Sequence, residues 1–255
     1  MRKFFGNFIS FFIPNKKLRK RIRNKYKMDA KYKGLNVVSS GKSLNKFVDW
    51  IKKYSTLEVK NIMEIGANYG QDSDFLYKAF KLDPNNVWVF EANPYIFKDV
   101  KRIHPFKSFN YAVFNKNGTL EFNVCDTGKM SENTGISSIY DIKDKKRNQL
   151  LYKSKVNVKS VRMDDFMKKN KINEIYFLKL DVEGCNFEVL DGFGDRLKDV
   201  KSIHVEAEHI EFWKNQKLYN DIEKLLKKFG FDLIYFERYT DQSDSFWIKK
   251  EYIKL

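Results

Sequence analysis

The sequence predicts an α/β fold: a doubly wound, mostly parallel, Rossmann-like sheet with an antiparallel edge and a strand-rich insertion. Two stretches of alternating helices and apolar strands, at residues 44–113 and 175–229, indicate the parallel core. Short alternating segments between them indicate the insertion, at about residues 114–160. Two final apolar segments close the chain in the manner of a hairpin and supply the antiparallel edge.

Apolar spacing and turn residues define the elements of the first stretch. Gly66 and Gly70 mark a tight turn after a strand, and Asp83-Pro84 closes a helix. In order, we expect a helix around 44–51, a strand at 61–65, a helix at 72–81, a strand at 87–90, a helix at 94–102 and a strand at 106–113.

The same signals define the rest of the chain, where Gly230 ends the last long helix. We expect insertion strands at 119–124 and 155–161, then a strand at 175–180, a helix at 186–190, a strand at 202–206, a helix at 218–229 and strands at 232–237 and 245–249. The chain therefore divides into a basic, aromatic, helical extension at residues 1–45 and one large domain at residues 46–255.

Composition indicates a packed globular protein, because 42% of the 255 residues are apolar and 16% are aromatic. The two cysteines, Cys125 and Cys185, cannot form a CxxC motif, so we expect free thiols in a reducing compartment. No apolar run is long enough for a membrane span or an export signal. The expected location is the cytoplasm.

The net charge of +16 is concentrated at the N-terminus. Residues 1–33 contain 12 Lys and Arg, one acid and several Phe and Ile side chains. Two interpretations remain open: a docking helix with a solvated basic face, or peripheral contact with the anionic inner face of a membrane.

Three of the predicted strands end in acidic residues. Their ends carry EIGANYG at residues 64–70, FEANP at 90–94 and LDVEG at 180–184. In an open α/β sheet, ligands bind beyond the carboxyl ends of the strands, so we expect these acids to surround one site.

The loop at 64–70 and Glu91 favour S-adenosylmethionine over a nicotinamide dinucleotide. The glycine turn lets a ligand approach the backbone but lacks the third glycine of the dinucleotide fingerprint. Glu91, 25 residues after Gly66, can accept the ribose hydroxyl protons and would repel a 2′-phosphate. A sulfonium cofactor has no pyrophosphate to neutralise, and an acidic pocket suits it.

Together these motifs resemble the FkbM family of methyltransferases. The resemblance covers residues 60–250 and includes SVRMDDF at 160–166, FLKLDVEG at 177–184 and DSFWIK at 244–249. It implies a class I methyltransferase fold and O-methylation, often of sugar hydroxyls in polysaccharides or glycosylated natural products. The family commonly has Asp where this chain has Glu64, which preserves the charge.

The resemblance also implies roles for individual residues. The methionine end of the cofactor is assigned to Glu64, Gly66, Asn68 and Gly70, the ribose to Glu91 with its neighbour Asn93, and the amino group or the incoming substrate to Asp181. Ser137 and Ser138 are expected near the cofactor, with turn-forming hydrogen bonds as the alternative.

Methyl transfer to a hydroxyl needs positioning and a base. The candidate bases are Asp181, Glu183, Glu206, Glu208 and His209, all at or just after predicted strand ends, and Asp181, Glu206 and His209 are selected as the catalytic residues. As a further hypothesis, Asp181, Glu206, Glu208 and His209 could bind Mg²⁺ or Mn²⁺.

The sequence therefore predicts an S-adenosylmethionine-dependent O-methyltransferase acting on a sugar hydroxyl of a cell-surface polysaccharide or its activated precursor. The expected partner is a carbohydrate or sugar nucleotide. An RNA methyltransferase is one alternative, because of the basic charge, but the acids at 181–184 disfavour a phosphate backbone. A non-catalytic binding protein on the same fold is the other.

Overall fold

The structure, a computed structural model, describes residues 42–125 and 135–254. Most of the predicted N-terminal extension, with its expected membrane contact, lies outside these residues. Helix α3 (Lys42–Tyr54) packs on the sheet, since the ring of Phe47 stacks on Phe246 at 4.3 Å between centroids. The predicted domain boundary at residue 46 therefore falls inside a helix of the domain.

A seven-stranded sheet forms the centre of the fold, in the order β3-β2-β1-β7-β8-β10-β9. Its strands are β3 (Lys107–Phe109), β2 (Val87–Phe90), β1 (Ile62–Ile65), β7 (Phe177–Leu180), β8 (Ser202–Glu208), β10 (Gln242–Lys249) and β9 (Phe231–Arg238). The pairings are parallel from β3 to β8, and β10 runs antiparallel to both β8 and β9. The predicted fold class and its antiparallel edge are confirmed.

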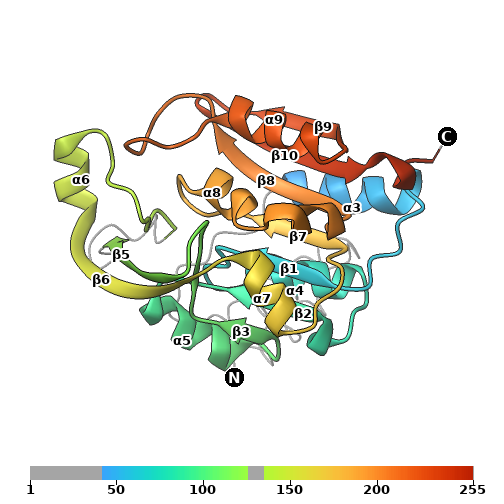
Figure 1. Cartoon of the computed structure of the whole chain (residues 1–255), viewed down its shortest axis with the longest axis horizontal. Helices are drawn as coiled ribbons and strands as arrows, with labels where there is room; N and C mark the ends of the chain where they lie inside the picture. The colour runs from blue at the N-terminus through green and yellow to red at the C-terminus, as the bar shows by residue number, and fades with distance from the viewer. Residues whose placement is uncertain (1–41, 126–134, 255) are drawn as a thin grey trace, which may run out of the picture. The chain divides into compact units, whose positions relative to one another are not determined.

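Helices cover both faces of this sheet (Figure 1). On one face lie α3 and α4 (Gln71–Ala79), where Phe47 and Phe80 both pack on Phe177. On the other face, a single apolar core joins α7 (Met163–Lys169), α8 (Asn186–Asp191) and α9 (Tyr219–Lys228) to the inner strands. Outside the insertion, the remaining described helices are α5 (Pro94–Ile103) and the short 3₁₀ helices η1 (Pro84–Asn86), η2 (Gly194–Asp199) and η3 (Lys250–Tyr252).

The insertion forms its own three-stranded sheet, in the order β4-β6-β5. It contains β4 (Ala112–Val113), β5 (Gly118–Cys125), α6 (Lys145–Leu151) and β6 (Tyr152–Val161). The predicted third strand at 106–113 is divided, because the Asn110 side chain donates to the carbonyls of Glu91 and Ala92 at 2.8 and 3.0 Å. The chain then leaves the main sheet and joins the insertion through β4.

Both cysteines are free and buried, as expected. Among the described helices, none has the length and apolar character to cross a membrane. The central strands β1 and β7 are buried along their whole length, so a charged residue within them needs a specific partner.

Candidate functional site

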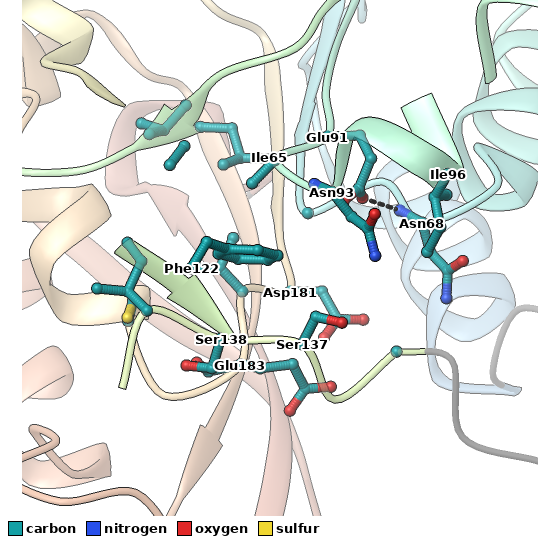
Figure 2. Close-up of a pocket in the computed structure, with 18 of the residues that line it drawn as sticks. Ile65, Asn68, Glu91, Asn93, Ile96, Phe122, Ser137, Ser138, Asp181 and Glu183 are labelled. Carbon is teal, nitrogen blue, oxygen red and sulfur yellow. Dashed lines mark hydrogen bonds between the residues drawn. The ribbon is translucent and has the colours of Figure 1, made fainter. Parts of the chain in front are cut away.

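A pocket opens beyond the carboxyl ends of β1, β2 and β7, where the strand-terminal acids were expected to meet (Figure 2). Seven of the predicted site residues line it: Gly66, Asn68, Glu91, Asn93, Ser137, Ser138 and Asp181. An apolar wall that the sequence did not reveal completes it, with Ile96, Tyr111, Val113, Phe122 and Ile139 among its members.

The loop after β1 needs glycine at two positions for different reasons. Gly66 has φ +83°, and a Cβ there would lie 2.0 Å from the carbonyl oxygen of Asp181. Gly70 has φ +71° and lies against the ring of His104, whose Nε2 is 2.8 Å from the carbonyl oxygen of Tyr69. Gly66 thus allows the end of β1 to contact the backbone that follows β7. Gly70 is not part of the described pocket lining and packs against His104, which supports the loop.

Glu64 does not line the described part of the pocket. It is 2% exposed and accepts hydrogen bonds from the backbone N–H of Ser73, at 2.9 Å, and from the Ser73 hydroxyl. Burial raises its pKa to about 8, although nearby Lys179 opposes the shift. Its carboxylate fixes the first turn of α4 to β1, and the cofactor contact that the resemblance implies stays a prediction.

Glu91 lies at the end of β2 and faces the pocket with an organised carboxylate. Its Oε2 accepts from the backbone N–H of Asn68 and its Oε1 from that of Asn93, both at 2.7 Å. Burial raises its pKa to about 7. Since each carboxylate oxygen has two lone pairs, one acceptor site per oxygen is left for a ligand.

Asn93 has two structural roles. Its side chain caps α5 by accepting from Tyr95 N–H at 3.0 Å, and Pro94 occupies the first helical position, as the sequence predicted. Its backbone N–H holds Glu91. The segment therefore positions Glu91 as well as starting the helix.

The opposite side of the pocket is formed by Asp181 and Glu183 after β7, with the segment around Ser137 and Ser138 (Figure 2). Ser138 Oγ donates to the Glu183 carbonyl at 2.6 Å and accepts from Tyr140 N–H at 3.1 Å. Ser137 Oγ accepts from Cys125 N–H at 3.0 Å. Ser138 thus makes the turn-forming bond of the alternative interpretation, to Tyr140, whereas the bond of Ser137 joins residues 12 positions apart. Both residues line the pocket.

The other predicted catalytic residues lie behind this side and outside the described lining. Burial and the charge of Asp181 raise the pKa of Glu206 to about 9. Glu208 accepts from Gln216 Nε2 at 3.0 Å, and burial raises its pKa to about 7. His209 Nε2 is 3.0 Å from Ser243 Oγ, and its pKa is lowered by burial.

The predicted metal site is not assembled. Within residues 42–125 and 135–254, no group of three or more His, Cys, Asp or Glu side chains has the geometry to hold an ion. His209 instead packs its ring against Tyr219, with 5.0 Å between the ring centroids. The structure therefore gives the Mg²⁺ or Mn²⁺ hypothesis no support.

Sequence reasoning also missed two supporting residues. One is His104, which is 5% exposed and supports the glycine loop through its contact with the Tyr69 carbonyl. Lys179 lies within the apolar strand β7 and contacts Asp181, which lines the pocket. The sequence signal that could have identified Lys179 is a lysine between two leucines in an apolar strand.

The family model described as the methyltransferase FkbM domain matches residues 64–233, which is more than half of the chain. The chain belongs to this family. The FkbM match spans every described pocket-lining residue, from Ile65 to Cys185. No curated protein matches the chain in sequence.

Solved structures resemble this FkbM-family chain only distantly. Methyltransferase FkbM from Methylobacillus flagellatus KT is 10% identical over 88% of this chain and 60% of its own length, with a TM-score of 0.47. Magnesium protoporphyrin IX methyltransferase from Synechocystis PCC 6803, with bound SAM, is 10% identical over 98% of both chains, with a TM-score of 0.45. These similarities are too low to say anything about substrate or chemistry.

Proposed function

We propose that this chain transfers the methyl group of S-adenosylmethionine to a hydroxyl oxygen, and that the acceptor is a sugar hydroxyl of a polysaccharide or of its activated precursor. Membership of the FkbM methyltransferase family supports the reaction class. The acceptor class follows from what that family commonly methylates, and the acceptor screen described below is its test.

The observation that carries the proposal is the carboxylate of Glu91. It is buried, fixed by two backbone N–H groups and left with one free acceptor site on each oxygen. Two neighbouring hydroxyls of a ribose fit two such acceptors, as they do at the end of the second strand in other nucleotide-binding α/β sheets.

The charge of the pocket supports a cationic sulfonium ligand. Its described lining contains three carboxylates, those of Glu91, Asp181 and Glu183, and neither lysine nor arginine. A dinucleotide would place a negatively charged pyrophosphate beside these carboxylates, and no cationic side chain in the described lining would neutralise it. The apolar wall at Ile96 and Tyr111 is suited to the adenine ring.

Bound adenosylmethionine would supply an electrophilic methyl group, leaving the protein to position the acceptor and remove its proton. We assign the two acids after β7 to different tasks. Asp181 faces the amino group of the cofactor, and Glu183 accepts the proton of the acceptor hydroxyl. A carboxylate whose pKa is raised by burial, as in Glu183, is a stronger proton acceptor once it is ionised.

Calorimetric titration with adenosylmethionine tests the donor site. Wild-type protein should bind it, and Glu121→Gln on the exposed surface of β5 should bind equally well as a control. Absence of binding at millimolar concentrations would refute the proposal. A screen with labelled adenosylmethionine against nucleotide-activated sugars, acidic glycans and RNA then tests the acceptor, with RNA methylation as the outcome that would overturn the sugar assignment.

Replacement of the proposed base should separate chemistry from binding. In Glu183→Gln we expect turnover on the acceptor found by the screen to fall by about 10² to 10⁴, the usual contribution of a positioned base. Adenosylmethionine affinity should change less than about threefold. An unchanged rate constant would assign the proton transfer to another group.

A further inference from the structure

Lys179 is a buried cation in the middle of the central sheet. Its side chain is 4% exposed, and it lies in register between Glu64 of β1 and His204 of β8. Burial alone would lower the pKa of Lys179, but the three surrounding carboxylates outweigh this effect and raise it. The lysine therefore stays charged.

The three carboxylates around Lys179 come from three different segments. Its Nζ lies 3.0 Å from Asp181 Oδ2 after β7, 3.2 Å from Asp72 Oδ2 in the first turn of α4, and 4.0 Å from Glu64 Oε1 in β1. Across the described segments, no other lysine or arginine forms an ion pair with any of these acids. Lys179 is thus the shared partner of all three.

These contacts join the two sides of the pocket. Gly66 touches the Asp181 backbone too closely for any side chain to lie between them. The side chains are instead connected through Lys179, which links Asp181 to Asp72 at the start of the helix that follows the glycine loop. An acidic side chain without this cation would be repelled by its neighbours.

We propose that Lys179 is a positioning residue for the methyl-donor site, holding the Asp181 carboxylate in the orientation that meets the amino group of adenosylmethionine. The inference rests on the proposed function and deepens it. Lys179 touches neither donor nor acceptor in this assignment. It acts through Asp181, with Asp72 fixing it from the side of α4.

The test compares adenosylmethionine affinity, by calorimetry, with melting temperature. Lys179→Met should weaken binding by at least about thirtyfold, because it removes the buried charged partner of Asp181. Lys179→Arg retains the charge and should recover most of the affinity. The matched control is Lys249→Met, since Lys249 is also a buried sheet lysine but donates to the carbonyl of Phe229, away from the pocket.

A second variant separates positioning from charge balance. In Lys179→Met with Asp72→Asn, one positive and one negative charge are removed together, so the melting temperature should return toward that of the wild type. The affinity should stay low, because Asp181 still lacks its partner. The double variant also keeps the test usable if Lys179→Met alone does not fold.

Each alternative result has a separate meaning. If wild type does not bind adenosylmethionine, the proposed function fails and the inference fails with it. If wild type binds and Lys179→Met matches the Lys249→Met control, only the role of Lys179 is overturned. Recovery of both affinity and stability in the double variant, or unfolding of both Lys179→Met variants, would show that the lysine serves the fold alone.

Discussion

The two sides of the pocket hold their carboxylates in opposite ways. On the donor side, which we define as Glu91 in the pocket wall and Glu64, buried in β1 outside the described lining, each carboxylate accepts hydrogen bonds from backbone N–H groups. On the acid side, defined as Asp181, Glu183 and Glu206, no described backbone N–H bonds these carboxylates, and only Asp181 has an ion-pair partner.

The difference lies in how each carboxylate is held, because burial raises the pKa on the donor side too, to about 8 in Glu64 and about 7 in Glu91. Backbone N–H groups fix a carboxylate because they cannot move without disturbing the strand or helix that carries them. Burial raises the pKa values of Glu183 and Glu206, and repulsion from neighbouring carboxylates such as Asp181 raises them further. Under the proposed function, the firmly held donor side would bind the cofactor and the acid side would accept the proton of the acceptor hydroxyl.

The largest effect should come from breaking the contact between the two sides. Gly66→Ala would place a Cβ 2.0 Å from a backbone oxygen at φ +83°, so we expect a loss of more than about 3 kcal/mol of stability and no detectable adenosylmethionine binding. Urea denaturation and calorimetry measure the two quantities.

Gly230→Ala is the control for this change. Gly230 has a similar φ of +76° but open space around the added Cβ, so the backbone conformation alone should cost about 1 kcal/mol. Equal losses in the two variants would mean that the contact at Gly66 has no special importance.

A smaller effect should follow from altering one side chain of the donor side. Glu91→Gln replaces one acceptor oxygen with an NH₂ group, which faces the N–H of Asn68 or Asn93. We expect affinity for adenosylmethionine to fall by about 10- to 100-fold, since one hydrogen bond to a charged group is worth about 1.5–3 kcal/mol. Calorimetry at pH 8 measures it, and unchanged affinity would remove Glu91 from the site.

The smallest effect, when expressed per pH unit, should be a pH dependence of stability that arises on the acid side. Burial raises the pKa of Glu206 from 4.5 to about 9, so its folded form favours the neutral carboxyl. Its contribution to stability is fully present below pH 4.5 and is lost as the pH rises through 9, with a slope of at most about 1.4 kcal/mol per pH unit.

Glu206→Gln should therefore flatten the decline in the free energy of unfolding between pH 5 and 9, measured by urea denaturation. Glu121→Gln, at an exposed position on β5, should leave that decline unchanged. A slope in Glu206→Gln equal to that of the wild type would show that Glu206 is not the source of the pH dependence.

The sequence predicted the parallel half of the fold well because its signals are local. Glycines after a strand, Pro94 at a helix start and apolar runs each act over a few residues, and β1, β2 and α5 formed where expected. The break between β3 and β4 could not be predicted, because it depends on Asn110 reaching the carbonyls of Glu91 and Ala92 in three dimensions.

In the candidate site, too, local signals predicted some residues, while others depend on three-dimensional packing. Motif position correctly brought Gly66, Asn68, Glu91 and Asp181 to one pocket, because all of them follow strand ends. The place of Glu64 in its motif could not show that its side chain points toward Ser73, because that direction depends on which face of β1 Glu64 occupies. Lys179, the apolar wall and His104 depend on register and packing between distant segments, which a single sequence does not encode locally.

The pairing of β1 with β7 has a consequence for synthesis of the protein. These strands are adjacent in the sheet, and Asn61 bonds Tyr176 across 115 residues of sequence. At about 5–20 residues per second, translation takes roughly 6–23 s to deliver the second strand after the first. During that interval the nascent chain carries an apolar strand with one edge open, so aggregation and chaperone capture should be most frequent there.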